Sequence, residues 1–233
     1  MIFTTKLNHF QNQKNYIICE CGSHIKQIAR LMVEEGIKNY DGLWDLPGTV
    51  AAAVYGNAGC YGCEMSRIFD SADILTPQGN IRTLYLNDLS FSKRDSSLKR
   101  GVIKGVILSV KLKKERGDVE LIKKQAVIAH WQRMNMQPGP QNNLGSCFMS
   151  GTKRMWYRVY QRFVSFLNRY LHLNLCPLEL ELRLLGYSKL IPYLYDMNRF
   201  MWKDVQSVEA FDDYVRLYHK LYKKAKLEIN IFE

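Results

Sequence analysis

The sequence of 233 residues lacks the features of several protein classes. No apolar run approaches the length of about 20 residues that a membrane-spanning helix needs. The N-terminus does not have the basic and then apolar layout of a secretion signal, so we expect a cytoplasmic protein. No zinc-finger, RNA-recognition or helix-turn-helix pattern accompanies the net charge of +11. The basic charge is the only feature of the sequence that favours nucleic-acid binding, and it is not enough to predict it. We therefore expect neither a nucleic acid nor a membrane as a partner.

Metal-ligating patterns are also lacking. Of the six cysteines, Cys60 and Cys63 have the Cys-x-x-Cys spacing, but no second pair at ligand spacing accompanies them. Without an export signal the cysteines are expected to be reduced. We therefore predict no metal site and no disulfide. Hydrophobic residues make up 47% of the chain, which is ample for one large or two small packed domains.

The segment 45–64 differs from the rest of the chain. It contains four glycines, four alanines and one proline, but no lysine or arginine. Pro47-Gly48 predicts a turn, and Thr49 predicts the N-cap of a short helix through Ala51–Ala53. Free N–H groups at such a helix start would suit an anionic ligand such as a pyrophosphate. A tightly packed turn before a buried helix is the alternative.

Hydrophobic periodicity predicts an α+β protein. We expect strands at 16–21, 102–112, 178–185 and 227–232, a hairpin at 72–84 around Pro77-Gln78-Gly79, a loop at 136–145, and helices at 23–35, 118–134, beyond 151 and at 211–226.

Three details of this assignment are specific enough to test. Ser23 should cap the helix that Gly36 ends. The strand at 102–112 should bury one face, made of Val106, Leu108, Val110 and Leu112. The aromatic residues at helical spacing after residue 151 should be core, and they are Trp156, Tyr160, Phe163, Phe166 and Tyr170.

The order of residues in segment 45–64 resembles a known signature. Leu46-Pro47-Gly48-Thr49-Val50 and Asn57-Ala58-Gly59-Cys60-Tyr61-Gly62 are similar to the FAD-binding motif of the UDP-N-acetylenolpyruvoylglucosamine reductase (MurB) family of peptidoglycan synthesis. Ala51 and Ala52 replace that motif's paired glycines. The resemblance implies FAD contacts from Leu46, Pro47, Gly48, Thr49, Val50, Ala52, Asn57, Gly59, Tyr61 and Gly62.

Two further segments resemble the family's catalytic motifs. Residues 89–99 resemble Leu-x-Phe-x-Tyr-Arg-x-Ser-x-x-Lys, which implies that Arg94 stabilises the enolate formed from the substrate. Residues 143–148 resemble Ala-Gly-Ser-Phe-Phe, which implies that Ser146 donates a proton to the substrate carbanion.

The sequence also departs from the family's pattern. Lys93 replaces a tyrosine that contacts substrate, Met136 replaces a lysine, and Met149-Ser150-Gly151 replaces Lys-Asn-Pro. Two segments compete for the family's C-terminal glutamate. Glu181 fits the Leu-Glu-x-Glu pattern and is our choice, but residues 227–230, with Glu228 and Asn230, lie nearer the C-terminus.

The resemblance implies a fold and a function. Residues 1–135 should form a lobe like the second FAD-binding lobe of the MurB and vanillyl-alcohol-oxidase type of flavin fold, and residues 136–233 a reduced, mostly helical substrate-type domain. The first lobe's Gly-Gly-Gly-Ser-Asn loop is absent, so FAD binding should be weak or lost, or a second subunit should supply that lobe.

The function implied is that of an FAD oxidoreductase of the UDP-N-acetylmuramate dehydrogenase type. It would use NADPH to reduce the enolpyruvyl ether of UDP-N-acetylglucosamine to UDP-N-acetylmuramate, in cell-wall or surface-sugar synthesis. The alternative is a non-catalytic MurB-like protein that binds a nucleotide sugar or a partner protein.

Overall fold

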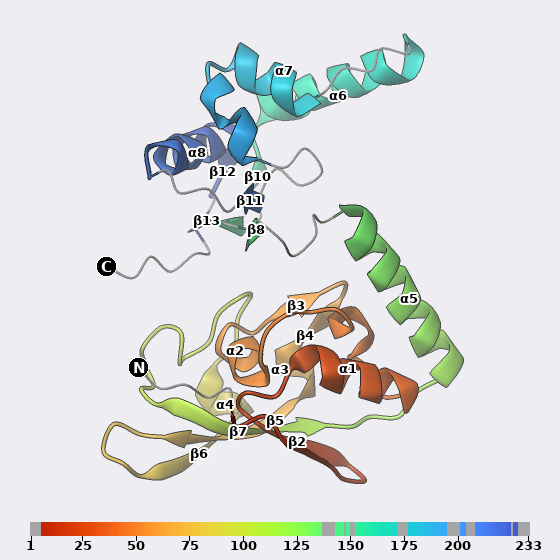
Figure 1. Cartoon of the computed structure of the whole chain (residues 1–233), viewed down its shortest axis with the longest axis vertical. Coiled ribbons are helices and arrows are strands. Elements are labelled where there is room, and N and C mark those ends of the chain that lie inside the picture. The colour runs from red at the N-terminus through yellow and green to blue at the C-terminus, as the bar shows by residue number, and fades with distance from the viewer. Residues whose placement is uncertain are drawn as a thin grey trace. The chain divides into compact units, whose positions relative to one another are not determined.

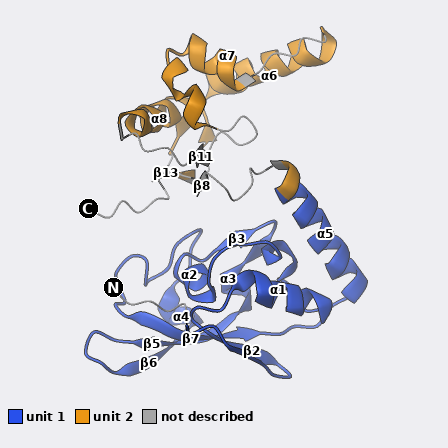
Figure 2. Cartoon of the chain, in the orientation of Figure 1, with its two compact units in different colours: residues 1–133 blue, residues 134–233 orange. Residues whose placement is uncertain are grey.

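The computed structural model describes residues 6–136, 143–146, 148–149, 152–171, 177–194, 201–203, 208–224 and 226–227. The chain forms two compact units, unit 1 (residues 1–133) and unit 2 (residues 134–233), shown in Figure 2. The fold is α+β, as the sequence predicts, with a sheet in unit 1 and mainly helices in unit 2.

Unit 1 contains the following elements in chain order: β1 (Phe10–Asn12), β2 (Tyr16–Glu20), α1 (Ile25–Glu34), the 3-10 helix η1 (Asp41–Leu43), α2 (Val50–Tyr55), β3 (Gly59–Cys60), β4 (Cys63–Glu64), α3 (Met65–Ile68), β5 (Phe69–Leu75), β6 (Ile81–Tyr85), α4 (Leu86–Leu89), β7 (Val106–Lys113) and α5 (Val119–Met136), which continues into unit 2.

Five strands form one antiparallel sheet in the order β1-β2-β7-β5-β6 (Figure 1). The predicted hairpin is confirmed, since β5 and β6 are joined by a turn from Thr76 to Asn80 in which Gly79 has φ +82°. A positive φ of this size is why a glycine stands there.

The predicted buried face of β7 is only half right. Val110 and Leu112 are fully buried, but Val106 and Leu108 are only half-buried, and Ile107 is buried instead. The pairing with β5 shifts at this point, where Asp73 faces Ser109 and Ile74 faces Ile107. Leu108 is therefore the extra residue of a bulge, which reverses the alternation of the strand.

Helix α1 begins one residue later than predicted. Its N-cap is His24, whose side chain makes no capping hydrogen bond, and the Ser23 hydroxyl instead donates to the His9 carbonyl at 2.9 Å. Gly36 ends the helix as expected, at φ +71°. A Cβ added to Gly36 would lie 2.5 Å from Cγ2 of Val119, so packing against α5 also requires glycine.

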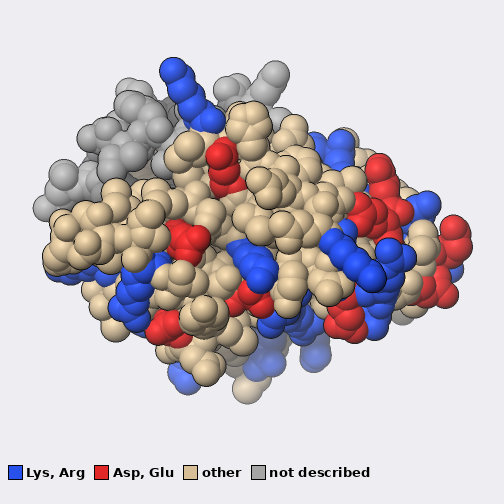
Figure 3. All heavy atoms as spheres, turned by 90° about the horizontal axis from the view of Figure 1, so that it is seen from below, with Lys and Arg blue, Asp and Glu red and all other residues tan. Residues whose placement is uncertain are grey.

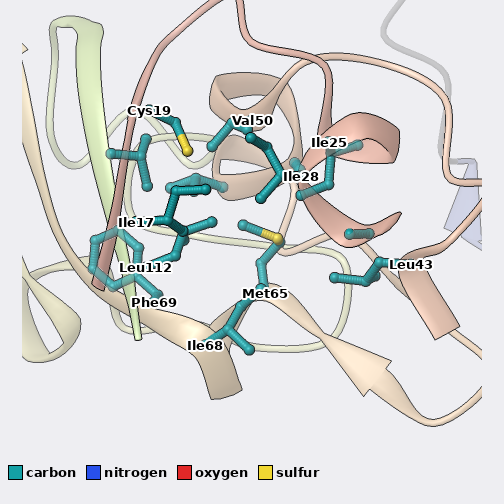
Figure 4. Packing of buried hydrophobic residues seen from close by; sticks show 14 of the residues in the cluster. Ile17, Cys19, Ile25, Ile28, Leu43, Val50, Met65, Ile68, Phe69 and Leu112 are labelled. Atoms are coloured by element: carbon teal, nitrogen blue, oxygen red, sulfur yellow. The ribbon is translucent and has the colours of Figure 1, made fainter. Parts of the chain in front are cut away.

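The core of unit 1 lies between the sheet and helices α1 and α2. In Figure 4 the side chains of Ile25, Ile28 and Val50 extend toward Ile17 and Cys19 of β2. All five are fully buried. This core fixes the positions of the loops that flank α2.

Unit 2 contains β8 (Asn143–Ser146), β9 (Phe148–Met149), β10 (Thr152–Lys153), α6 (Met155–Tyr170), α7 (Pro177–Leu184), the 3-10 helix η2 (Ser188–Tyr193), β11 (Met201–Lys203), α8 (Val208–Leu221), β12 (Tyr222–Lys223) and β13 (Lys226–Leu227). The strands form separate two-stranded pairs, β8 with β11, β9 with β13 and β10 with β12. The core of the unit is rich in stacked rings, such as Phe148 on Tyr218 at 3.9 Å.

The predicted strand at 178–185 is wrong, because these residues form helix α7. Leu178 and Leu182 are both buried, at helical rather than strand spacing. Glu179 and Arg183 form an ion pair at 2.7 Å across one helical turn. Leucine, glutamate and arginine are strong helix formers, and no β-branched residue opposes them.

The predicted aromatic core of α6 is wrong for four of its five residues, and only Tyr160 packs, half-buried, against the core of unit 2. Trp156, Phe163, Phe166 and Tyr170 are exposed, whereas Tyr157 and Val164 on another face of the helix are buried. Helix α8 ends at Leu221, five residues before the predicted end. The strand predicted at 227–232 falls mostly outside the described residues, as does much of the loop at 136–145.

Candidate functional site

A loop before α2, the Pro-Gly loop (residues 45–49), presents open backbone on unit 1. Gly48 has φ +104°, and a Cβ added there would have no atom within 4 Å. The Gly48 carbonyl accepts a hydrogen bond from the Ile25 N–H at 3.2 Å. Within the described part of the chain, the N–H groups of Gly48 and Thr49 donate no hydrogen bond. The loop therefore has two backbone donors, those of Gly48 and Thr49, that are open within the described residues.

The helix start after this loop is not the predicted anion site. Thr49 caps α2 as predicted, accepting from the Ala52 N–H at 3.3 Å. The two preceding N–H groups are engaged as well, that of Val50 with the Ser23 carbonyl at 2.8 Å and that of Ala51 with the Cys21 carbonyl at 3.2 Å. The expectation of free donors at the start of α2 was wrong, and the open donors belong to the loop.

The β3–β4 hairpin (residues 59–64) supplies a second open glycine. Tyr61 and Gly62 have φ values of +47° and +87°, as a two-residue turn of type I′ requires. A Cβ at Gly62 would meet nothing within 4 Å, whereas one at Gly59 would clash with the Cys63 carbonyl oxygen. Gly62 therefore leaves room for a ligand, and Gly59 is required by packing.

Asn57 connects this hairpin to another segment. Its side chain is 2% exposed and both ends of the amide are engaged. Nδ2 donates to the Ser92 carbonyl at 2.9 Å, and Oδ1 accepts from the Ser66 N–H at 3.0 Å. The Asn57 side chain thus holds together the segments before the β3–β4 hairpin and around Arg94.

Arg94 lies at the tip of a tight turn, the arginine turn (residues 92–95). Ser92 and Asp95 exchange two backbone hydrogen bonds of 3.1 Å each, and Arg94 has φ +59°. The turn is braced from outside: Lys99 Nζ donates to the Arg94 carbonyl at 3.0 Å, and Arg100 pairs with Asp95 at 2.7 Å. The backbone that carries the Arg94 guanidinium is therefore firmly positioned.

Cys60 marks the point where these segments meet. Burial raises the pKa of its thiol, while the nearby charges of Arg133 and Arg94 lower it and that of Asp45 raises it. Arg133, on α5, donates to Cys60 Sγ at 3.6 Å and lies over the Tyr61 ring at 5.8 Å. The Pro-Gly loop, the β3–β4 hairpin and the arginine turn are thus neighbours, with two guanidinium groups among them.

Asp45 anchors the Pro-Gly loop to two helices. Its carboxylate accepts from Arg30 at 2.9 Å and contacts Lys26 at 3.4 Å, both on α1, and lies 2.5 Å from Nδ1 of His130 on α5. Burial alone would raise the pKa of Asp45, but hydrogen bonds from His130, Arg30 and Lys26 outweigh it, and the net shift is downward. The carboxylate therefore stays ionised at neutral pH.

Sequence reasoning missed the contributions of His130 and Arg133. The two residues are three apart on α5, so they share one face of that helix, which is a readable signal. What the sequence did not indicate is that this face lies against segment 45–61.

The ten predicted cofactor residues differ in accessibility. Pro47, Gly48, Ala52 and Gly62 are exposed, and Leu46, Thr49, Gly59 and Tyr61 are half-buried. Val50 and Asn57 are buried. Three of the four exposed members, Pro47, Gly48 and Gly62, lie on the Pro-Gly loop and at the hairpin tip, so a ligand would reach the segment there.

The other predicted catalytic residues belong to unit 2. Ser146 ends β8 and pairs with Met201 of β11. Glu181 is on α7, 3% exposed, beside a small cavity of about 20 Å³ lined by Tyr157, Tyr214 and other core side chains. The competing Glu228 and Asn230 lie outside the described residues.

The described residues lack two further kinds of feature. Among them no group of three or more histidine, cysteine, aspartate or glutamate side chains could hold a metal ion. No described helix has the length and apolar character needed to cross a membrane. On the face seen in Figure 3, basic and acidic side chains are interspersed, so charge of one sign does not dominate it.

Comparisons with known proteins agree with this geometry. Residues 1–85 match a family described as an FAD binding domain. The UDP-N-acetylenolpyruvoylglucosamine reductase of Caldicellulosiruptor saccharolyticus is 42% identical over 99 residues, which are 42% of this chain and 32% of that protein. The reductase of Pediococcus pentosaceus is 30% identical over 151 residues, which are 65% of this chain and 50% of that protein. The chain thus spans about a third to a half of these curated relatives.

A solved structure shows the same fold. The crystal structure of UDP-N-acetylenolpyruvylglucosamine reductase (MurB) from Thermus caldophilus aligns with a TM-score of 0.65 at 17% identity, over 93% of this chain and 72% of that one. The expected second subunit finds no support in these comparisons. Sequence similarity over part of the chain and the FAD-domain match, together with the shared fold, show that the chain resembles the UDP-N-acetylenolpyruvoylglucosamine reductases.

Proposed function

We propose that the protein is a flavoprotein that uses NADPH to reduce the enolpyruvyl ether of UDP-N-acetylglucosamine to UDP-N-acetylmuramate. The observation that carries this proposal is the pair of open glycines, Gly48 and Gly62, on two loops of unit 1, with the Arg133 guanidinium on Cys60 and Tyr61 beside Gly62. The charge of Arg94 also acts on the Cys60 thiol, whose pKa it lowers. A phosphate-bearing cofactor needs both free backbone donors and positive charge. The match of residues 1–85 to an FAD binding domain supports FAD as that cofactor.

The residues present fit part of an FAD molecule. The Gly48 and Thr49 N–H groups would donate to its pyrophosphate, and the open surface at Gly62 would admit it without a clash. Arg133 would add positive charge beside the hairpin. Only these two loop donors are open, because the N–H groups at the start of α2 are already bonded within the protein, so we expect binding to be weak.

When bound and reduced by NADPH, FAD would supply the hydride for reduction of the enol ether. Arg94 would stabilise the negative charge that develops on the substrate, since its guanidinium is permanently charged and can contact two carboxylate oxygens at once. Ser146 would protonate the neighbouring carbon, and Glu181 would assist that proton transfer. The reaction would take place in the cytoplasm, where the free thiols of Cys19, Cys21, Cys60 and Cys63 would remain reduced.

A non-catalytic protein that binds a nucleotide sugar or a partner protein is the second candidate. The observation that favours it is Lys93, which stands exposed on the arginine turn in place of a substrate-contacting tyrosine. Met136 stands in place of a lysine, and residues 149–151 stand in place of Lys-Asn-Pro, and both replacements also favour a non-catalytic protein. This candidate predicts ligand binding without turnover.

Two measurements separate the candidates. Quenching of FAD fluorescence by the folded protein tests cofactor binding, and NADPH oxidation that depends on the enolpyruvyl substrate tests catalysis. If circular dichroism shows that the protein is folded and it still does not quench FAD fluorescence, the flavoenzyme proposal is ruled out. If the protein quenches FAD fluorescence but shows no substrate-dependent NADPH oxidation, the non-catalytic binding protein is the remaining candidate.

If oxidation occurs, variants assign the roles. Arg94→Lys should lower turnover by on the order of 10²-fold with a smaller effect on KM, because lysine keeps the charge but loses the planar fork. Arg82→Lys, the same change at an exposed arginine of β6, is the control and should be neutral. Ser146→Ala should reduce turnover by about 10²-fold while FAD binding is retained, and Ser146→Cys should keep part of it. Equal turnover of Arg94→Lys and wild type would remove Arg94 from this role.

A further inference from the structure

Helix α6 (Met155–Tyr170) has three distinct faces. One face, with Tyr157 and Val164, is buried in the core of unit 2. At 100° per residue, the remaining circumference divides into an apolar face and a basic face. A surface helix whose apolar side chains served only the core would have a single apolar face.

The apolar face is exposed. The side chains that form it share an arc of about 100° and recur three to four residues apart. Their exposed fractions run from 43% for Trp156 to 72% for Met155, and the members are Met155, Trp156, Val159, Phe163, Phe166 and Tyr170. We call this set the aromatic stripe. Large apolar side chains gathered so closely on a surface indicate a contact with something apolar.

The basic face flanks the stripe on one side. Arg158, Arg162 and Arg169 are exposed and recur at helical spacing. Among the residues that the structure describes, these three arginines have no hydrogen-bonding or ion-pair partner. Residues 152–171 contain five basic residues and no aspartate or glutamate. Arg158, Arg162, Phe166, Arg169 and Tyr170 together line a shallow hollow.

We propose that α6 is a membrane-surface helix, which lays its aromatic stripe into the interfacial region of a bilayer rich in anionic phospholipid. Aromatic side chains favour the boundary between headgroups and acyl chains, and arginines beside them would pair with lipid phosphates. The helix is about 24 Å long at 1.5 Å per residue, and it would lie along the surface rather than cross the bilayer. This contact was not expected from the sequence, which predicted no membrane partner.

Charge and layout favour a lipid surface over two other occupants. A second copy of the chain would bring its own three arginines to the same contact, and like charges would oppose the pairing. A nucleic acid would need aromatic rings mixed with basic side chains, as in stacking platforms. Here the two sets are segregated on the helix, and Met155 and Val159 in the stripe have no ring to stack.

Co-sedimentation of the full chain with vesicles tests the proposal. Vesicles of equal parts phosphatidylglycerol and phosphatidylcholine should carry the protein down at low salt, and vesicles of phosphatidylcholine alone should carry down much less. Added salt should weaken the binding, because it screens the arginines. Absence of binding to the anionic vesicles overturns the proposal.

Variants separate the two faces of the helix. Arg158→Gln with Arg162→Gln should weaken binding about 25-fold, at about fivefold for each basic side chain. Phe163→Ser with Phe166→Ser should weaken it at least about tenfold through lost apolar burial. All four side chains are exposed, so helicity and thermal unfolding should remain as in wild type.

A matched control and two competing outcomes complete the test. Lys14→Gln with Lys104→Gln removes two charges from exposed lysines of unit 1 and should leave vesicle binding nearly unchanged. If this control weakens binding as much as the arginine pair, the attraction is general and α6 is not the site. A shift of single-stranded oligonucleotide that the α6 variants abolish, or dimerisation that Phe163→Ser abolishes, would assign the stripe to those partners and refute the membrane contact.

Discussion

Replacing Asn57 with alanine removes the link between the β3–β4 hairpin and the arginine turn. The wild-type side chain makes two hydrogen bonds, to the Ser92 carbonyl and from the Ser66 N–H. Alanine leaves both of these backbone groups without that partner. It also places a Cβ-bearing residue with no local hydrogen bond at φ +41°, in the left-handed region.

The expected loss can be estimated from these three changes. Each hydrogen bond removed from a buried backbone partner costs about 1 kcal/mol or more. The left-handed backbone adds about 1 kcal/mol for alanine, which lacks the side-chain hydrogen bond that makes asparagine tolerable there. We therefore expect unit 1 to lose about 3 kcal/mol of its free energy of unfolding, a large part of the stability of a typical domain.

Native-state hydrogen exchange provides the assay, because amides of β2 and β7, such as those of Ile17 and Val110, report on unit 1 alone. The control is Asn57→Gly, which removes the same hydrogen bonds but accepts the positive φ, so it should be about 1 kcal/mol more stable than Asn57→Ala. The Asp95 amide, which donates to the Ser92 carbonyl, should lose protection in both variants. Unchanged protection of Asp95 would refute the bridging role of Asn57.

Three further predictions concern other parts of unit 1. Gly36→Ala should destabilise by about 2 kcal/mol in urea unfolding, because its Cβ would lie 2.5 Å from a Val119 methyl at a backbone φ of +71°, and a loss below about 0.5 kcal/mol would contradict the tight contact. Asp45→Asn should cost about 1 kcal/mol at neutral pH. Because folding lowers the pKa of Asp45, its contribution is fully present above the ordinary aspartate value of about 3.9 and is lost as pH falls through the lower folded pKa, so wild type and variant should converge in acid. Cys63, buried and with its pKa raised to about 12, should react with iodoacetamide far more slowly in folded than in urea-unfolded protein, and equal rates would show that the thiol is accessible.

Local chemistry allowed part of unit 1 to be predicted from the sequence. The Thr49 cap, the hairpin around Gly79 and the end of α1 at Gly36 each depend on a few adjacent residues, and each is confirmed. The bulge at Leu108 depends on how β7 pairs with β5, a strand more than thirty residues away, so the strand's own pattern could not reveal it.

Unit 2 was harder to predict because tertiary packing overrides local patterns there. Alternation over 178–185 suggested a strand, but the helix forms and buries Leu178 and Leu182 together. The spacing of aromatics in α6 was helical as expected, yet periodicity alone cannot say which face of a helix meets the core. That choice depends on the rings of α8, such as Tyr214 and Tyr218.

The sequence predicted which residues belong to the candidate site better than it predicted their hydrogen-bond partners. The signature identified segment 45–62, but it could not show that the start of α2 is already bonded to the Ser23 and Cys21 carbonyls. Nor could it show that the Asn57 amide is engaged inside the protein. Such contacts depend on segments that only the fold brings together.

The strand order has a consequence for how the chain acquires its fold during synthesis. β7 is the last strand of the sheet to be made, yet it lies at the centre, where Tyr16 pairs with Lys113. Until residue 113 has left the ribosome, β1–β2 and β5–β6 are separate hairpins, and two-stranded hairpins are marginal in water. Pairing over so long a chain separation is slow, so the nascent chain exposes its apolar strands until translation of β7 is complete.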